Sequence, residues 1–175
     1  TCELVFKDCF VPEENILGEL NKGVRVLMSG LDYERVVLAA GPVGIMHAVL
    51  DVAVPYVHER KQFNQAIGEF QLVQAMLADS QADLYAGICM TRDAAKKFDA
   101  GEDISMLAAC CKMFTTEAAG RIADNAVQIH GGAGYMSEYK VERFYRDVRL
   151  LRLYEGTTQI QQLVIGRNLL KSAQG

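Results

Sequence analysis

Apolar residues recur at helical spacing along most of this chain, and no other feature limits its fold as strongly. Beyond residue 18, no segment alternates apolar and polar residues as a half-buried strand would. The spacing predicts helices over residues 21–60, 71–99, 104–130, 138–147 and 158–171. Short connections between such helices favour antiparallel packing. We therefore expect an all-α fold, an antiparallel four-helix bundle with short extra helices.

Glycine and proline set the expected ends of these helices. The first residues of the chain read as extended chain and turn, with Gly18 marking a loop. The segment over 21–60 should be one long helix or two that join near Gly41 and Pro42, because proline within a helix removes a hydrogen bond. Gly101 should follow the second long helix as its C′ residue.

Composition and charge exclude several classes of protein. Half of the residues are hydrophobic and 23% are charged, which is typical of a globular domain and not of a disordered tail. The net charge is −4 with scattered Lys and Arg, so we expect no nucleic acid as a partner. The longest apolar run, Val36–Met46, is shorter than the roughly 18 residues that suggest a membrane span, so we expect no span.

Neither the cysteines nor the histidines are arranged as a metal site. The five cysteines are odd in number and form no C-x-x-C pair, which favours reduced thiols with packing roles. The three histidines lack a spacing such as H-x-x-x-H, so we expect no metal. The stretch "HGGAGY" from His130 could cradle a phosphate, but it follows a predicted helix, and its glycines would equally end that helix. His130 itself reads as a structural histidine.

Glu155 is the first of two glutamates that stand out by position. It lies in "RLYEGTTQIQ", just before a predicted helix whose free N–H groups favour an anion. Thr158 and Gln161 match the S/T-x-x-E/Q capping box at this point. Position alone favours a capping charge for Glu155, whereas the adjacent glycine and threonines would let the backbone approach a ligand closely.

Glu34 is the second such glutamate. At 100° per residue it falls within an apolar stripe, so on a regular helix it should face the core. The stripe consists of Leu27, Leu31, Leu38 and Ile45. A carboxylate in the core needs a partner or a ligand cavity, and desolvation makes it a stronger base. Two interpretations stay open, a buried ion pair with an arginine of another helix and a catalytic base.

Three long motifs, in this order and spacing, resemble the C-terminal helical domain of the acyl-CoA dehydrogenases. They are "ERKQFNQAIGEFQLVQ" (59–74), "AVQIHGGAGYMSEYKVERFYRDVR" (126–149) and "YEGTTQIQQLVIGR" (154–167). The lead "ELVFKDCFVPEENILGE" is similar to the closing strand and exit loop of that family's middle β-domain. The resemblance implies a short β/loop remnant of the middle domain with its linker over residues 1–20, and the helical bundle domain over 21–175.

The resemblance also implies a reaction and a cofactor, and it is strongest to the isovaleryl-CoA or short branched-chain branch. The implied reaction is α,β-dehydrogenation of a short or branched acyl-CoA thioester, in which a glutamate removes the α-proton and the β-hydrogen leaves as hydride to FAD. The residues implied to bind FAD are Arg60, Lys61, Gln62, Phe63, Gln71, Gln128, Gly131, Gly132, Gly156, Thr157 and Gln159. Those implied to line the acyl-CoA pocket are Asp32, Tyr33, Arg35 and Tyr154.

Different branches of the family carry the catalytic base at different positions, and this sequence resembles both. The two positions correspond to Glu155 and Glu34. Close carboxylates do not ionise readily together, so one would stay protonated while the other acts. We favour Glu155, because the motif around it is intact.

The implied partners are acyl-CoA, an electron-transfer flavoprotein as acceptor, and further copies of the chain in a homodimer or homotetramer that shares FAD between subunits. The implied compartment is the cytoplasm in a bacterium or the mitochondrial matrix in a eukaryote. Two alternatives stay open. The chain would be a catalytically silent helical module for oligomerisation and FAD sharing, or part of a related acyl-CoA oxidase.

Overall fold

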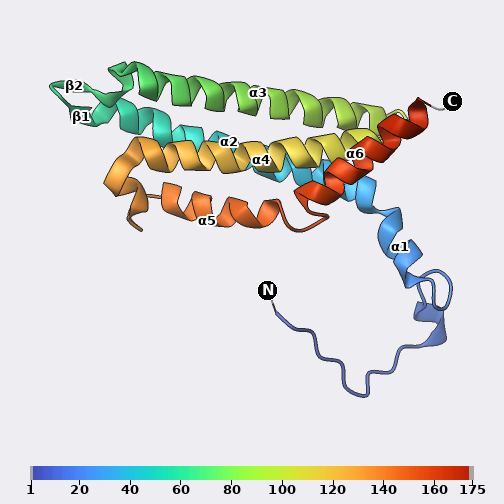
Figure 1. Ribbon diagram of the computed structural model, residues 1–175. Helices are drawn as coiled ribbons and strands as arrows, with labels where there is room; N and C mark the ends of the chain where they lie inside the picture. The colour runs from blue at the N-terminus through green and yellow to red at the C-terminus, as the bar shows by residue number, and fades with distance from the viewer. Residues whose placement is uncertain (1, 174–175) are drawn as a thin grey trace. The chain divides into compact units, whose positions relative to one another are not determined.

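The computed structural model describes residues 2–173 and confirms the all-α prediction (Figure 1). The chain divides into two compact units, one up to Leu31 and one from Asp32 on. The first unit contains a 3₁₀ turn, η1 (Glu13–Asn15), and a short helix, α1 (Gly23–Ser29). Its described residues form no strand. The assignment of residues 1–20 to a neighbouring domain stays a prediction.

The second unit is a helical bundle with one small hairpin. Its elements are α2 (Leu31–Glu59), β1 (Lys61–Gln62), β2 (Gln65–Ala66), η2 (Ile67–Glu69), α3 (Gln71–Asp99), α4 (Ser105–His130), η3 (Gly131–Tyr135), α5 (Val141–Leu151) and α6 (Thr158–Ser172). The helices predicted over 71–99, 104–130 and 158–171 are confirmed. The hairpin, in which Lys61 pairs with Ala66, replaces part of a predicted loop.

Residues 21–60 form neither the single helix nor the two helices joined near Gly41 and Pro42 that were the two predicted alternatives. Helix α2 runs without interruption through Pro42 and Pro55, and the chain leaves helical pairing at Gly30 instead. Each proline removes one backbone hydrogen bond, and the packing of a long helix against the core outweighs that loss. Pro42 is itself buried and forms part of the packed face.

Helix α3 ends as its sequence predicts. Gly101 has a φ of +75°, the left-handed conformation that a C′ glycine supplies at low steric cost. The N–H of Gly101 donates to the Phe98 carbonyl at 2.9 Å, and the N–H of Glu102 donates to the Lys97 carbonyl at 3.0 Å. This pair of bonds is a Schellman motif, which satisfies carbonyl groups that the helix end would leave free.

The core of the bundle surrounds α4, whose buried face consists mostly of small residues. Its alanines from Ala118 to Ala126 pack with Met46 and Val49 of α2, Leu84 of α3 and Val148 of α5. Small side chains let neighbouring helices come close to α4 on several sides. Helix α4 contacts α3, α5, α6 and η3, so it positions the candidate site residues that lie on α3, α6 and η3.

Among the helices of residues 2–173, only α2 has the length and composition of a membrane-spanning helix. A core helix of a globular bundle meets the same criterion, and α2 packs as one. Its buried positions include Ala39, Met46, Val49, Ala53 and Val57, at spacings of three to seven residues along one face. These side chains contact the core formed with α3 and α4, so the protein itself buries the apolar face.

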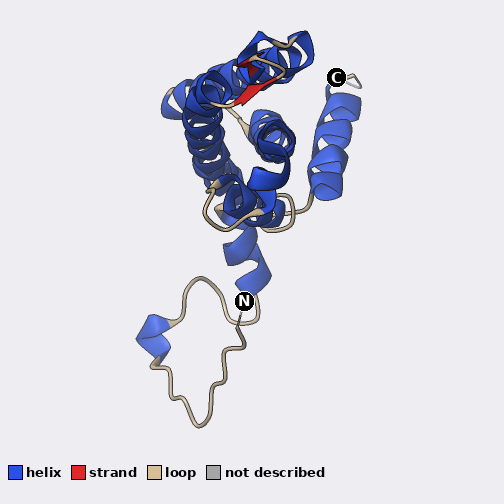
Figure 2. Cartoon of the chain, turned by 90° about the vertical axis from the view of Figure 1, so that its left-hand side faces the viewer, coloured by secondary structure: helices blue, strands red, loops and turns tan. Residues whose placement is uncertain are grey.

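The hairpin lies at one end of the long helices, and α6 lies across the other end (Figure 1). Figure 2 views the bundle from the hairpin end and shows the two short strands in red beside the helices. Arg35 and Glu59 are 24 residues apart on α2, which at a rise of 1.5 Å per residue corresponds to about 36 Å. The two ends of the bundle therefore present separate sets of candidate residues.

Candidate functional site

The loop between α5 and α6 carries Glu155 in an unusual backbone conformation. Glu155 has a φ of +56° and Gly156 a φ of +89°, so two consecutive residues are left-handed. Glycine adopts this conformation readily, whereas a glutamate held there costs on the order of 1 to 3 kcal/mol. Such a residue persists only where its surroundings determine the loop. Residues of that kind cluster at functional sites.

Two fully buried side chains fix the conformation of the Glu155 loop by hydrogen bonds to its carbonyl groups. The Lys112 Nζ of α4 donates to the Gly156 carbonyl at 2.7 Å. The Gln161 Nε2 of α6 donates to the carbonyls of Glu155 and Gly156, at 3.0 Å in each case. Lys112 and Gln161 are both 0% exposed. The Glu155 carbonyl is thus bonded to α6, and the Gly156 carbonyl is bonded to both α4 and α6.

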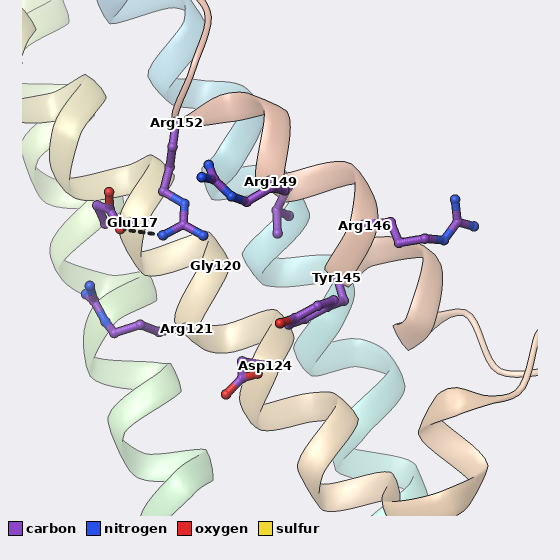
Figure 3. A pocket seen from close by; sticks show the side chains of 9 residues that line it. Glu117, Gly120, Arg121, Asp124, Tyr145, Arg146, Arg149 and Arg152 are labelled. Carbon is purple, nitrogen blue, oxygen red and sulfur yellow. Dashed lines mark hydrogen bonds and ion pairs between the residues drawn. The ribbon is translucent and has the colours of Figure 1, made fainter. Parts of the chain in front are cut away.

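Glu117 of α4 joins the two flanks of the same loop. Its carboxylate accepts from the Thr158 hydroxyl at 2.6 Å and from the Arg152 Nη1 at 3.0 Å. Figure 3 shows Arg152 reaching from the end of α5 toward Glu117. Burial would raise the pKa of Glu117, but the hydrogen bonds from Thr158 and Arg152 outweigh it, and the pKa lies below its ordinary value. An ionised Glu117 therefore holds both the end of α5 and the start of α6.

The groove beside this ion pair, between α4 and α5, has a volume of about 520 Å³. Several arginines line it (Figure 3), and carboxylates neutralise most of them. Arg121 pairs with Asp83 at 2.8 Å, and Arg146 pairs with Glu142 at 2.9 Å. Because these charges are matched within the chain, the groove does not present a concentrated positive charge to an anion.

The capping box predicted for Thr158 and Gln161 at the start of α6 is wrong. The N-cap is Thr157, whose side-chain oxygen accepts from the N–H of Ile160 at 3.4 Å. The Thr158 hydroxyl donates to Glu117 instead, and the Gln161 side chain turns back to the Glu155 loop. The helix begins where the sequence predicts. The polar side chains are used to hold the preceding loop.

Glu34 does not face the core, so that prediction is wrong. Glu34 is exposed in this chain, and Arg35 next to it is buried. The predicted stripe counted Leu27 as part of the same helix, whereas Leu27 belongs to α1, before the break at Gly30. The buried face of α2 instead begins at Arg35 and Val36. Within the described residues Glu34 makes no ion pair, so the predicted bond to an arginine of another helix is wrong too.

The first turn of α2 lies at the Glu155 end of the bundle. The Arg35 Nη1 donates to the Asp32 carboxylate at 3.0 Å, and the ring of Tyr33 lies 5.2 Å from that of Phe98. Burial lowers the pKa of the Lys112 ammonium, and the Arg35 charge lowers it further, whereas Glu117 and Glu155 oppose that shift. Charged groups of α2, α4 and the Glu155 loop therefore act on one buried ammonium.

The other predicted binding residues lie at the hairpin end. Phe63 and Asn64 form its two-residue turn with φ values of +53° and +65°, the left-handed pair of a type I′ turn. This turn leaves the Phe63 ring 88% exposed, at an edge-to-face distance of 6.1 Å from Phe70. Arg60 and Lys61 are exposed, and in the described part of the chain neither makes an ion pair.

An open groove of about 810 Å³ brings several of these residues together. Gln62, Phe63, Gln71 and Gln128 all line it, although they come from the hairpin, α3 and α4. Gly131 and Gly132 follow at the end of α4, and an added Cβ at either position would meet open space. The hairpin, the start of α3 and the end of α4 thus form one surface.

His130, beside these glycines, is structural as its sequence context predicts. Its ring stacks on Tyr56 at a centroid distance of 3.9 Å, and its Nδ1 lies 2.7 Å from the Ala126 carbonyl. Burial lowers the pKa of His130, although the contact with Ala126 opposes the shift. A neutral ring would thus hold the turn that presents Gly131 and Gly132.

Sequence analysis missed Lys112 and Glu117, and it assigned Gln161 to a capping box only. Lys112 lies on the same face of α4 as Ala108, Thr115 and Ala119, at spacings of three, four and seven residues. A lysine within such a stripe is a signal that can be read from sequence, because a buried ammonium requires a partner. The partner, a backbone carbonyl in a distant loop, has no sequence signal.

The chain belongs to the acyl-CoA dehydrogenase family. Its residues 21–170 match the family model described as "Acyl-CoA dehydrogenase, C-terminal domain". The resemblance predicted from three motifs is therefore confirmed, and it identifies the bundle as the family's C-terminal domain.

Known relatives agree with this assignment. The chain is 49% identical over 171 residues to the mitochondrial isovaleryl-CoA dehydrogenase of Oryza sativa subsp. japonica, covering 98% of this chain and 42% of the relative. It is 43% identical to the CarC subunit of the caffeyl-CoA reductase–Etf complex of Acetobacterium woodii, covering 98% and 45%. The butyryl-CoA dehydrogenase structure from Megasphaera elsdenii superimposes with a TM-score of 0.90 at 40% identity, covering 95% and 43%. The chain thus spans less than half the length of these relatives.

Proposed function

We propose that the whole protein is an FAD-dependent acyl-CoA dehydrogenase and that Glu155 is its catalytic base. The observation that carries this proposal is the left-handed Glu155–Gly156 loop, held by buried Lys112 and Gln161. A base must lie within hydrogen-bond reach of the proton that it removes, so a fixed loop favours proton abstraction. Exposed Glu34, on a regular stretch of α2, has no comparable support.

In the proposed reaction, the Glu155 carboxylate removes the α-proton of a short or branched acyl-CoA thioester. Bound FAD supplies the hydride acceptor for the hydrogen that leaves the β-carbon. Tyr154 borders the same site. Burial and the Glu155 charge raise the pKa of the Tyr154 hydroxyl, which therefore stays protonated at neutral pH and is able to donate a hydrogen bond. Asp32, Tyr33 and Arg35 would line the acyl-CoA pocket at this end of the bundle.

The hairpin end fits the phosphate and adenine portion of FAD. The exposed cations Arg60 and Lys61 suit the pyrophosphate, and Gln62, Gln71 and Gln128 offer amide groups around the same groove. Gly131 and Gly132 leave open space in which a ligand can approach the backbone. The exposed ring of Phe63 offers an aromatic face.

The separation of the two ends supports a shared cofactor. Gly156, Thr157 and Gln159 are at the α6 end, about 36 Å along α2 from the hairpin residues. In this proposal the hairpin end of one copy and the Glu155 end of another bind opposite ends of one FAD molecule, and the two ends of a single copy bind different FAD molecules. A homodimer or homotetramer would then complete each site.

The acceptor and the compartment follow from the same assignment. We propose that an electron-transfer flavoprotein takes the electrons, a choice supported by the Etf complex to which the CarC relative belongs. The isovaleryl-CoA dehydrogenase relative from rice is named as mitochondrial. In a eukaryote the protein would work in the mitochondrial matrix, and in a bacterium it would work in the cytoplasm.

The test compares Glu155→Gln with Glu34→Gln in the whole protein, with turnover and flavin content measured together. We expect Glu155→Gln to lower kcat by roughly 100- to 10,000-fold at unchanged flavin content, because a general base contributes a factor of that size. Glu34→Gln should change kcat far less. The reverse ranking would contradict Glu155 as base. A whole protein that neither retains FAD nor oxidises a short branched acyl-CoA would indicate a silent helical module instead.

A further inference from the structure

We propose that Lys112 is a positioning residue for the reaction, because its bond to the Gly156 carbonyl fixes the loop on which Glu155 stands. The proposal rests on the function proposed above and assigns a role to a residue one helix away from the base. The Lys112 Nζ lies 2.7 Å from the Gly156 oxygen, and this ammonium makes no other hydrogen bond among the described residues.

The conformation of the loop shows why such a bond is needed. Glu155 and Gly156 are both left-handed, and Glu155 has the steric penalty of a Cβ in that region. Gln161 alone binds both carbonyls, but it belongs to α6, the helix that follows the loop directly. Lys112 adds a bond from α4, the helix at the centre of the core. The bond from Lys112 therefore fixes the position of the loop relative to the core of the bundle.

The other buried polar side chains of α4 are used differently. The hydroxyls of Thr115 and Thr116 donate to carbonyls one turn back, at Cys111 and Lys112, with lengths of 2.8 Å. Both hydroxyl groups therefore have hydrogen-bond partners within their own helix. The side chain of Lys112 instead extends to the loop at Gly156, 44 residues further along the sequence. A bundle stabilised only by packing has no need of that bond.

Burial of a lysine ammonium costs desolvation free energy, and an apolar side chain at a purely structural position would avoid that cost. Lys112 is 0% exposed, and desolvation opposes its charge. The charged groups that act on it are Arg35 of α2, Glu117 of its own helix and Glu155 of the loop. Replacing a buried ion pair by apolar side chains of similar volume is often neutral or stabilising, whereas removing one member leaves the other without a partner. Lys112 donates to a carbonyl that Gln161 also binds, so its replacement by methionine leaves that carbonyl with a hydrogen bond. Stability and turnover should therefore respond in different ways to its replacement.

The first experiment uses the whole protein with FAD and compares Lys112→Met, Lys112→Arg and the control Lys96→Met. Lys96 is an exposed lysine of α3. We expect Lys112→Met to lower kcat by about 100-fold, the loss expected for a misplacement of roughly 1 Å. KM, flavin content and Tm should not fall, and Lys112→Arg should restore part of kcat. The kinetic isotope effect with α-deuterated acyl-CoA should rise, because proton abstraction becomes slower.

The second experiment probes the loop without catalysis. A glutamate-specific protease cleaves after Glu155 only if the loop leaves its fixed conformation, so the cleavage rate at this bond reports how firmly the loop is held. We expect faster cleavage in Lys112→Met than in the parent protein or in Lys96→Met. If Lys112→Met fails to fold, Lys112→Gln, whose side chain is too short to reach Gly156, replaces it in both experiments.

Three outcomes overturn the proposal: an unchanged kcat in Lys112→Met, an unchanged cleavage rate at Glu155, or a loss of kcat that follows a loss of Tm and is not relieved by Lys112→Arg. Failure of the proposed function looks different. In that case Glu155→Gln leaves turnover unchanged, while the protease still reports whether Lys112 holds the loop.

Discussion

The two ends of the bundle are built in opposite ways. At the α6 end, the Glu155 loop is held by three buried or half-buried side chains, Lys112, Glu117 and Gln161, all bonded within the chain. At the hairpin end, Arg60 and Phe63 are exposed, and Gly131 and Gly132 face open space. The α6 end has its geometry before any ligand arrives, whereas these side chains at the hairpin end make no ion pair with the part of the chain that the structure describes.

This difference matches the two tasks that the proposed function assigns. A catalytic base gains from preorganisation, because a small misplacement is costly in rate. A cofactor-binding surface gains from exposed charges, since charge-assisted bonds to phosphate form only when the ligand is present. Substitutions at the α6 end should therefore change turnover or stability, and substitutions of exposed side chains at the hairpin end should change flavin affinity alone.

The largest expected effect on stability separates two glycines of the hairpin end. At Gly134 an added Cβ would lie 2.6 Å from the Val127 carbonyl and 2.9 Å from the His130 Cβ. Gly134→Ala should therefore lower the free energy of unfolding by about 2 to 3 kcal/mol. Gly132→Ala meets open space and should leave it unchanged. Urea unfolding of both variants measures this. An equal loss in the free energy of unfolding for both variants would mean that Gly132 is as closely packed as Gly134.

Flavin affinity should respond next, through Arg60. A charge-assisted phosphate bond is worth about 2 kcal/mol, so Arg60→Ala should raise the Kd for FAD by roughly 30-fold. Isothermal titration of the whole apoprotein measures the change. Arg143→Ala is a matched control, because Arg143 is exposed and pairs with Asp147 on α5 at 3.4 Å. An unchanged Kd in Arg60→Ala would remove this residue from the cofactor surface.

Glu117 should give a smaller effect that depends on pH. Its pKa in the folded protein is lower than its ordinary value of 4.5, because the bonds from Thr158 and Arg152 outweigh burial. The folded state thus favours the ionised form, and this stability is present above pH 4.5 and is lost as the pH falls through the lower folded-state pKa. Glu117→Gln should lower the free energy of unfolding at pH 7 by about 1 kcal/mol.

The measurement is Tm against pH for the parent protein and Glu117→Gln. The difference in Tm should be largest at neutral pH and should shrink on acidification below pH 4.5. Glu102→Gln, on the exposed turn after α3, is a control that removes a carboxylate without these bonds. A difference that stays constant across this range would show that the ionised form of Glu117 does not hold the loop.

The sequence predicted regular elements well because their signals are local. Helix α3 begins and ends where apolar periodicity and Gly101 indicate, and α6 begins directly after the Glu155 loop. The hairpin was missed, since its strands are only two residues long and no alternation can be read from them. The role of Thr158 was assigned to the wrong bond, because its partner, Glu117, is 41 residues away.

The candidate site was predictable only where a motif carries it. Glu155 and the glycines after His130 could be named from their motifs, whereas Lys112 was missed because its partner is a backbone carbonyl in another element. Glu34 was placed in the core because Leu31, Leu38 and Ile45 were taken as the buried face of α2, whereas these leucines and the isoleucine are half-buried. The buried face begins at Arg35 and Val36 and continues through Ala39 and Met46. Long-range contacts decide such positions, and periodicity within one segment does not report them.

The smallest expected effect is that of Glu34→Gln on stability. An exposed carboxylate in the first turn of a helix contributes about 0.5 kcal/mol through the helix dipole, so the loss should not exceed that value. Val36→Ala, two residues further and buried, should cost about 1 to 2 kcal/mol by loss of apolar burial. Urea unfolding of the two variants compares both positions directly. If Glu34→Gln costs as much as Val36→Ala, Glu34 faces the core after all, and the contrast between the fixed Glu155 and an unsupported Glu34 no longer favours Glu155 as base.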